Sequence, residues 1–448
     1  MAGISQPSGT TNSGFDPNKN YTAPLIIVTA LFFMWGFITC LNDILIPALK
    51  EAFDLNSVQA MLINSCFFGA FFFMAIPAGK IVEKLGYKLG IIVGLGTAAV
   101  GCFLFFPAAD LKVYELFLGA LFVLASGITI LQVAANPYVT LLGKPQTSSS
   151  RLTLTQAFNS LGTTLAPIFG TYAIFGAVQG KLSADAVQLP YVGLAAALAV
   201  LALFIGISKL PAVEKSNEIE ENIPAGAAFQ FRHLTLGVIA IFMYVGGEVA
   251  IGSLMTEYIS LDSVLGIPIK EAGYYVAFYW MGAMIGRFIG AGLLATLNPN
   301  KTLGFAAVMN IVLLLISVFT TGMVSMISVV AIGLFNSIMF PTIFALSING
   351  LGRFTSQGAS YLVMAIVGGA IIPIFQGYIA DSFLPAGVVS HEFKNEGIKI
   401  SYLLPILCYA YIAYFGFAGS VTDKSLNVDS EDKGSFEFEK EALAESKA

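Results

Sequence analysis

Long apolar stretches alternate with short polar connections along almost the whole chain. Twelve of these stretches reach the length of about 20 residues that an α-helix needs to cross the hydrocarbon core of a bilayer. The expected spans are residues 24–47, 59–80, 90–109, 114–142, 152–176, 190–209, 234–259, 271–297, 302–323, 325–349, 357–381 and 399–420. The pattern therefore predicts an all-α polytopic membrane protein with twelve transmembrane helices.

One long polar connection divides the twelve stretches into six and six. We expect residues 23–209 and 234–421 to form two six-helix bundles, joined by a cytoplasmic linker over residues 210–233. Residues 1–22 are expected to form a cytoplasmic N-terminal segment. Residues 422–448 are rich in Asp and Glu and poor in large apolar side chains, which predicts a disordered acidic tail.

The two predicted bundles carry similar motifs at matching positions. The second stretch ends in the basic run Gly79–Lys88, and the eighth contains Gly286-Arg287 near its end. The fourth stretch ends after Asn136-Pro137, and the tenth carries Pro341-Thr342. Two parallel six-helix repeats are typical of transporters, in which the substrate site lies near the membrane midplane at the repeat interface.

Composition and charge support a membrane protein and exclude several other classes. Hydrophobic residues make up 56% of the chain and charged residues 11%, whereas soluble domains carry about 25% charged residues. Lys and Arg gather in the loops on one side, which predicts that both termini lie in the cytoplasm. We expect the chain in a plasma membrane, the inner membrane of a bacterium. With only two histidines, the chain predicts no enzyme, no bound metal and no cofactor. We also expect a monomer without a nucleic-acid partner.

Two acidic residues interrupt otherwise apolar stretches. Asp43 follows Asn42 in the first stretch, and Glu248 follows two glycines in the seventh. A charged side chain at the centre of a membrane helix costs about 2.5–3.5 kcal/mol on insertion scales, and such residues usually mark proton relays, ion sites or substrate contacts. We predict proton coupling at Asp43 and Glu248, with Asn42 and Glu248 also in contact with substrate. Structural hydrogen bonds between helices are the alternative.

Side-chain amides recur at helical spacing on two neighbouring stretches. Gln132 and Asn136 are four residues apart, and Gln156 and Asn159 are three apart, so each pair shares a helix face. Each amide offers a donor and an acceptor, which suits the hydroxyl groups of a sugar. We predict that all four residues bind substrate, while hydrogen bonding between helices is the alternative.

Three further side chains have a predicted role near the site or at its cytoplasmic side. Trp280 does not lie at the end of a span, where interfacial tryptophans gather. Its ring could pack on the C–H face of a pyranose, or it could face lipid. Lys84 and Arg287 lie toward the cytoplasmic side, where we predict that they take part in gating.

Seven short motifs occur in order along the chain. They are Leu41-Asn-Asp-Ile-Leu45, Ile76-Pro-Ala-Gly79, Ala134-Ala-Asn-Pro137, Ala157-Phe-Asn-Ser160, Val245-Gly-Gly-Glu248, Gly286-Arg-Phe288 and Pro341-Thr-Ile-Phe344. By their order and placement, the chain resembles the fucose–proton symporter family of the major facilitator superfamily, over residues 24–420. The resemblance implies two pseudo-symmetric six-helix bundles, alternating access, and uptake of a small-molecule sugar coupled to protons or, in some relatives, to sodium.

The resemblance also implies roles for individual residues. Asp43 matches the first-helix acid that fucose symporters use for protonation and sugar binding. Their second acid falls on Gln132, which cannot titrate, and Glu248 stands where they tend to carry an amide. The chain is therefore more similar to the glucose/galactose branch. We expect proton-coupled hexose import, with sodium-coupled symport or efflux of a non-sugar molecule as alternatives.

Overall fold

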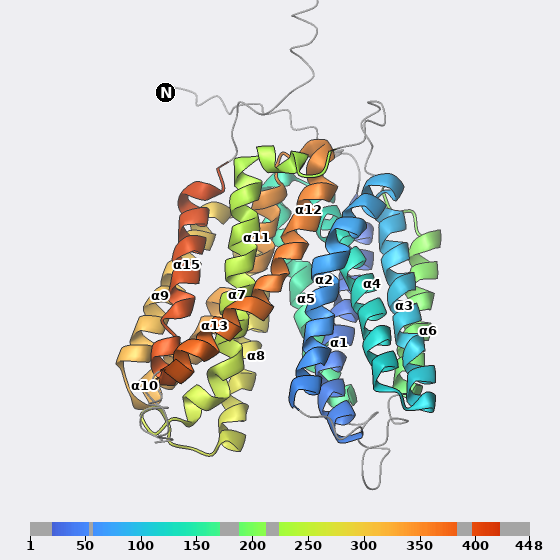
Figure 1. Cartoon of the computed structure of the whole chain (residues 1–448). Coiled ribbons are helices and arrows are strands. Elements are labelled where there is room, and N and C mark those ends of the chain that lie inside the picture. The colour runs from blue at the N-terminus through green and yellow to red at the C-terminus, as the bar shows by residue number, and fades with distance from the viewer. Residues whose placement is uncertain (1–19, 53–56, 171–187, 212–223, 383–396, 422–448) are drawn as a thin grey trace, which may run out of the picture.

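The computed structural model is a bundle of helices in the part of the chain that it describes (Figure 1). The described ranges are residues 20–52, 57–170, 188–211, 224–382 and 397–421. The N-terminal half holds α1 (Thr22–Ala52), α2 (Ser57–Leu85), α3 (Tyr87–Leu111), α4 (Tyr114–Leu141), the short η1 (Pro145–Thr147), α5 (Ser148–Gly170) and α6 (Gln188–Ile207). Residues 1–19 of the N-terminal segment expected at residues 1–22, and the whole tail expected at residues 422–448, lie outside the described ranges.

The C-terminal half follows a short 3₁₀ turn, η4 (Ala227–Gln230). Its longer helices are α7 (Arg232–Ser260), α8 (Ile269–Leu294), α9 (Pro299–Phe319), α10 (Gly322–Asn336), α11 (Met339–Ile348), α12 (Thr355–Met364), α13 (Gly368–Ser382) and α15 (Leu404–Tyr414). Its short elements are η5 (Gly352–Phe354), η6 (Ala365–Val367) and η7 (Phe415–Gly419).

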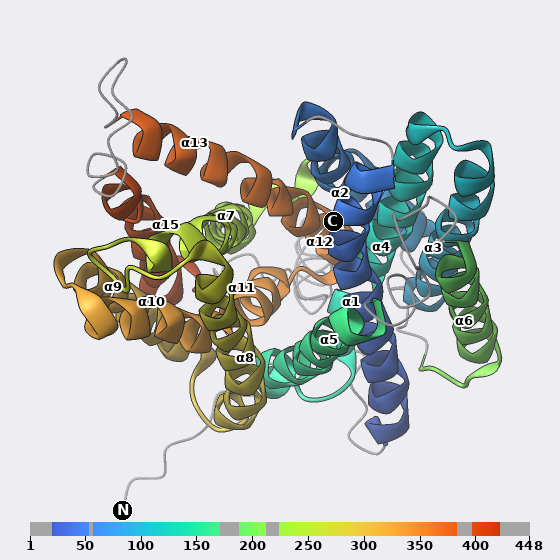
Figure 2. The same cartoon turned by 90° about the horizontal axis from the view of Figure 1, so that it is seen from below.

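Eleven helical segments of the described residues are long and apolar enough to cross a membrane. They include two compound segments, Gly322–Ile348 and Gly352–Ser382. α5 is not among the eleven because Ser, Thr, Asn and Gln side chains interrupt its apolar residues. α5 nevertheless runs through the middle of the bundle between α1 and α8 (Figure 2), which gives twelve spans. The predicted fold, an integral membrane protein with twelve membrane helices, is confirmed.

Two spans that the apolar pattern predicts as single helices are interrupted. α10 ends at Asn336 and α11 begins at Met339. Pro341 has no N–H to donate to the carbonyl of Ser337, so the helix loses a hydrogen bond at this break. In the next span, η6 separates α12 from α13. There Gly368 lies so close to the backbone of Phe242 in α7 that a side chain would not fit.

The two halves pack against each other chiefly through two pairs of helices, α5 with α8 and α2 with α12, and also through α5 with α11 and α4 with α12. Ser150 at the start of α5 donates a hydrogen bond to the Ala291 carbonyl in the last turn of α8, with Oγ and O 2.7 Å apart. Tyr87 and Ser356 share a side-chain hydrogen bond between the starts of α3 and α12. The halves are therefore joined at one end of the molecule.

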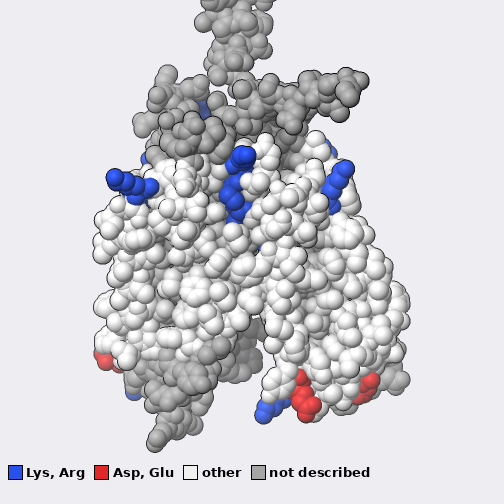
Figure 3. Space-filling model, turned by 180° about the vertical axis from the view of Figure 1, so that it is seen from behind, with Lys and Arg blue, Asp and Glu red and all other residues white. Residues whose placement is uncertain are grey.

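The space-filling view shows that the charges are divided between the two ends (Figure 3). On the visible face, most Lys and Arg side chains gather at the joined end, and the Asp and Glu side chains lie at the opposite end. A hollow separates the two halves at the acidic end. The white band between the ends carries no Lys, Arg, Asp or Glu on this face, as expected for a surface in contact with lipid.

Candidate functional site

A small cavity lies at the interface between the two halves. Its volume is about 160 Å³, well below the range of about 300–1,000 Å³ usual for sites of drug-sized ligands. Residues of both halves line this central cavity: Trp35, Gln132, Gln156, Tyr244, Val245, Glu248, Arg287, Phe340, Pro341 and Ile366. Its size and its polar groups suit a small polar solute.

The N-terminal half contributes one aromatic ring and two amides to the central cavity. Trp35 comes from α1, and its ring packs at 5.1 Å between centroids on Phe32. Gln132 of α4 and Gln156 of α5 are both buried and both reach the cavity. The structure thus brings together the two glutamines that the spacing of amides predicts as substrate ligands.

The C-terminal half contributes an acid held by a tyrosine. Tyr244 and Glu248 lie one helical turn apart on α7, and the Tyr244 hydroxyl donates to Glu248 Oε1 over 2.7 Å. The adjoining Gly246 packs against Ile372 and the Gly368 carbonyl of α13, where a Cβ would not fit. This close contact fixes the turn of α7 that carries the acid.

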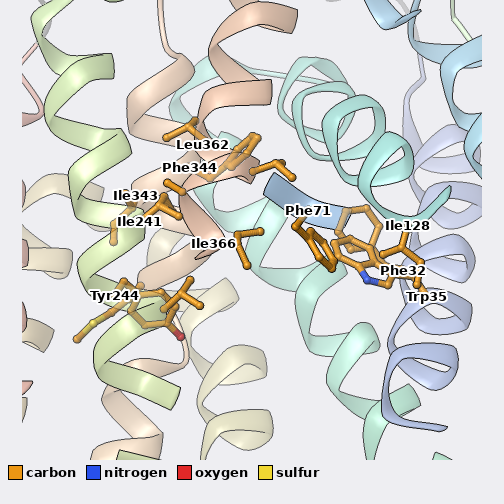
Figure 4. Packing of buried hydrophobic residues seen from close by; sticks show 14 of the residues in the cluster. Phe32, Trp35, Phe71, Ile128, Ile241, Tyr244, Ile343, Phe344, Leu362 and Ile366 are labelled. Atoms are coloured by element: carbon orange, nitrogen blue, oxygen red, sulfur yellow. The ribbon is translucent and has the colours of Figure 1, made fainter. Parts of the chain in front are cut away.

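Buried apolar side chains of both halves lie at the interface that holds the central cavity (Figure 4). The figure shows Tyr244 and Ile366 on the C-terminal side of the interface, and Phe71, Trp35 and Phe32 on the N-terminal side. Apolar side chains lower the local dielectric, and electrostatic interactions between charged groups are stronger there than in water. The charges in the central cavity therefore act on one another and on a bound solute more strongly than they would in bulk water.

Arg287 of α8 is the basic residue that lines the central cavity. Its Nε donates to the Ser337 carbonyl at the α10–α11 break over 3.3 Å, and its Nη1 donates to Ser160 Oγ of α5. Glu248 and Arg287 attract each other electrostatically. The gating role of Arg287 stays a prediction, and the structure adds that the side chain belongs to the cavity and joins the two halves.

Three predicted substrate ligands lie outside the cavity lining. Asn136 is fully buried one turn beyond Gln132, and within the described residues neither amide atom has a hydrogen-bond partner. Asn159 instead donates from Nδ2 to the Phe32 carbonyl over 2.9 Å, which ties α5 to α1. Trp280 is 48% exposed and packs edge-on against Tyr279. Helical spacing predicts a shared face, but one turn moves a residue about 5.4 Å along the axis, beyond so small a cavity.

Three other predicted residues lie away from the cavity or outside the described side chains. Lys84 lies exposed in the last turn of α2, at the joined end, and its gating role stays a prediction. Asn42 and Asp43 belong to positions of α1 whose side chains lie outside the described part of the structure. Their roles in substrate binding and proton coupling therefore stay predictions.

The polar groups of the central cavity can hold a polyhydroxyl compound. The amides of Gln132 and Gln156 donate and accept, the Glu248 carboxyl accepts, and Arg287 donates. The described residues contain no cluster of three or more His, Cys, Asp or Glu side chains that could hold a metal ion. Sequence reasoning missed Tyr244 as a site residue, although its position four residues before an intramembrane acid is a usable signal.

Comparison with known proteins places these features in a family. The Major Facilitator Superfamily matches residues 26–373. A glucose/galactose transporter of Brucella abortus (strain 2308) is 55% identical over 405 residues, which cover 90% of this chain and 95% of that protein. The L-fucose-proton symporter of Escherichia coli (strain K12) is 37% identical over 421 residues, 89% of this chain and 93% of the symporter.

Solved structures give the same result. The crystal structure of the transporter FucP in the outward conformation superposes with a TM-score of 0.80 at 35% sequence identity. The superposition covers 89% of this chain and 99% of that one. A structure of the proton:xylose symporter XylE, at 13% identity and a TM-score of 0.69, shares the fold.

Proposed function

This chain belongs to the Major Facilitator Superfamily, in the family that holds the fucose–proton symporters and the glucose/galactose transporters, and from that premise we propose that it imports a hexose together with protons. The family consists of transporters and not of enzymes. We propose a sugar of the glucose or galactose kind, because a protein named for these two sugars is 55% identical to this chain.

One observation carries the proposal. The central cavity joins two amides, an acid, an arginine and an indole ring from both halves of the chain in a volume of about 160 Å³. Sugar hydroxyl groups need neighbouring donors and acceptors, and Gln132, Gln156, Glu248 and Arg287 supply both. The face of Trp35 offers an apolar surface to the C–H groups of the ring. Efflux of a bulky apolar compound is less well supported, because the cavity is small and its lining includes two amides, an acid and an arginine.

Proton coupling is proposed because an ionised acid near the membrane midplane is energetically costly. A bound proton removes this charge. Glu248 lies in the central cavity beside Tyr244, and we propose that it takes up a proton before the loaded cavity changes its access. Asp43 of α1 is proposed as the second protonated group. Sodium coupling is the alternative.

The contacts that join the halves and the distribution of charge between the two ends define the proposed state. The end rich in Lys and Arg is proposed to face the cytoplasm of a bacterial inner membrane, by the positive-inside rule. The halves are joined at this end by Ser150 with Ala291 and by Tyr87 with Ser356. The conformation is then outward-facing, and import requires these contacts to break while the acidic ends close. The site lies within one chain, so we propose a functional monomer.

Transport by the purified full-length chain in proteoliposomes tests the proposal. We expect glucose or galactose to exchange in counterflow against a panel with fructose, N-acetylglucosamine and fucose. An inward pH gradient should drive accumulation, and a sodium gradient at equal pH should not. Glu248→Gln and Asp43→Asn should each reduce accumulation in response to the pH gradient. Accumulation driven by sodium alone, or an undiminished response in both variants, would refute proton coupling through these acids.

A further inference from the structure

The hydroxyl of Tyr244 has two acceptors within reach and only one proton to donate. Glu248 Oε1 lies 2.7 Å away, and the backbone carbonyl oxygen of Asn336 lies 3.2 Å away on the opposite element. Tyr244 is buried, so water does not replace whichever bond is lost. The direction of this hydroxyl proton therefore depends on whether the nearer group, the Glu248 carboxyl, accepts or donates a hydrogen bond.

The hydrogen bonding of Glu248 changes with its protonation state. An ionised carboxylate only accepts hydrogen bonds, whereas a carboxylic acid also donates one. With Glu248 ionised, the Tyr244 proton points to Oε1. When a proton from solution binds Oε1, the acid donates to the Tyr244 oxygen, and the hydroxyl proton turns to the Asn336 carbonyl. The carboxyl gains one proton, and the phenol keeps its own.

Asn336 is held rigidly by side chains from three helices. Its Oδ1 accepts from Asn310 Nδ2 of α9 and from the Tyr409 hydroxyl of α15, and its Nδ2 donates to the Tyr279 hydroxyl of α8. Each of these bonds is 2.8 Å long, and all four residues are buried. The Asn336 carbonyl is therefore a fixed acceptor, and the Tyr244 hydroxyl is the part that can turn.

The acceptor lies at the helix break that binds Arg287. Asn336 is the last residue of α10, and the carbonyl of the next residue, Ser337, accepts from Arg287 Nε. Arg287 in turn donates to Ser160 in the N-terminal half. A hydrogen bond gained or lost at the Asn336 carbonyl thus acts one residue from a contact that joins the two halves.

Several titratable or charged groups face Glu248 from the elements packed around it. They are Tyr244 on α7 itself, Arg287 and Tyr279 on α8, and Cys408 and Tyr409 on α15. Of the described residues, Tyr244 is the group whose hydrogen bond to the Glu248 carboxyl also reaches a backbone acceptor at the α10–α11 break. This gives it a role that the other four groups do not share.

We infer that Tyr244 is a positioning residue that transmits the protonation state of Glu248 to the α10–α11 break through the direction of its hydroxyl proton. The inference rests on the proposed function, in which Glu248 takes up a proton. It assigns the coupling between proton and conformation to a hydroxyl that turns, and not to Glu248 alone.

The pH profile of sugar counterflow, with equal pH on both sides, tests this role. A single titrating group changes a rate by up to about tenfold per pH unit, and we expect the Tyr244→Phe profile to flatten to less than about twofold over the range where the wild type responds. Profiles are compared after scaling to each variant's own maximum, because loss of the hydroxyl also alters the cavity wall. Tyr279→Phe removes a hydroxyl that accepts a hydrogen bond from Asn336, but it leaves the bond between Tyr244 and Glu248 in place. This variant should keep the wild-type profile.

Two outcomes overturn the inference: a wild-type profile in Tyr244→Phe, or equal flattening in Tyr279→Phe. If Tyr244→Phe does not fold, infrared difference spectra of the wild type with isotope-labelled tyrosine replace it. A tyrosine C–O band should then titrate together with a carboxyl band, and both changes should be absent in Glu248→Gln. A carboxyl that titrates without any tyrosine change overturns the inference.

The failure of the proposed function has a different signature. In that case the wild type does not accumulate sugar under a pH gradient, or Glu248→Gln accumulates it as the wild type does. If wild-type accumulation depends on Glu248 but Tyr244→Phe keeps its pH profile, only the role of Tyr244 is refuted.

Discussion

Ser150 of α5 donates a hydrogen bond across the interface between the halves to the carbonyl of Ala291 in α8, over 2.7 Å. This bond must break if the joined end opens. Removal of the hydroxyl in Ser150→Ala should therefore favour opening, by about 0.5–1.5 kcal/mol or a two- to tenfold shift in population. Spin labels at the exposed Leu89 and Leu297, in a cysteine-free background, would report the change as a longer distance.

Ser253→Ala is the matched control for that measurement. Its hydroxyl donates to the Val249 carbonyl within α7 and does not cross the interface. The control should leave the distance distribution unchanged. Identical distributions in Ser150→Ala and the wild type would show that the bond contributes nothing to closure.

Gly286 permits close packing of α8 on the α10–α11 break. A Cβ at this position would lie 2.6 Å from both the Leu334 carbonyl oxygen and Ser337 Oγ. Gly286→Ala should therefore separate the helices, displace Arg287, and lower the free energy of unfolding by about 1–3 kcal/mol. Thermal unfolding in detergent measures this loss.

Gly292 offers the same substitution on the same helix without the crowding. A Cβ there would meet no atom of the described residues within 4 Å. Gly292→Ala should be neutral or raise stability by up to about 1 kcal/mol, because Ala favours helix more than Gly does. Equal destabilisation of the two variants would contradict the packing argument.

The two tryptophans of the chain allow a spectroscopic test of the central cavity. Trp35 is 7% exposed and lines the cavity, whereas Trp280 is 48% exposed and lies outside the lining. Binding of sugar should change the fluorescence of Trp35 because the solute replaces water beside the indole. We expect the sugar-dependent signal to persist in Trp280→Phe and to vanish in Trp35→Phe. The reverse result would place the sugar near Trp280, as the sequence alone predicts.

Arg151 stabilises the turn between α4 and α5 through hydrogen bonds. Its guanidinium donates to the carbonyls of Val139, Thr140 and Lys144 and to the hydroxyl of Thr147. Arg151→Gln would leave the Thr140 carbonyl at the end of α4 without the donor that Arg151 supplies, and should lower the free energy of unfolding by about 1.5–3 kcal/mol. Thermal unfolding of Arg232→Gln provides the comparison. Arg232 is exposed and donates to the Tyr414 hydroxyl, so its loss should cost less than about 0.5 kcal/mol.

Much of the fold can be predicted from the sequence because the bilayer requires each span to be a helix of about 20 mostly apolar residues. The apolar runs mark the helices, but they do not mark the break at Ser337, since apolar residues continue on both sides of it. Pro341 is the local signal for the break, because it has no N–H to donate to the Ser337 carbonyl. The structure shows that Arg287 donates to this carbonyl instead.

The sequence predicts the types of polar side chain at the site, but it predicts only some of the residues that line the cavity. Gln132, Gln156 and Glu248 line the central cavity as predicted. Asn159 is the same type of residue at the same helical spacing, yet its amide bridges α5 to α1. Spacing along one helix cannot show whether the partner of an amide is a ligand or a neighbouring backbone. That choice depends on which helix packs against the residue.

The polarity of α5 has a consequence for how the chain is made. A translocon releases a segment into lipid according to its hydrophobicity, and α5 lacks the apolar content of the other eleven spans. The amide of Asn159 donates to the Phe32 carbonyl on α1, where Gly36 leaves room for α5 to approach. Membrane insertion of α5 during synthesis therefore depends on an earlier helix that stays nearby to receive it. Substitution of a bulky residue at Gly36 would act first on biogenesis, before any sugar is bound.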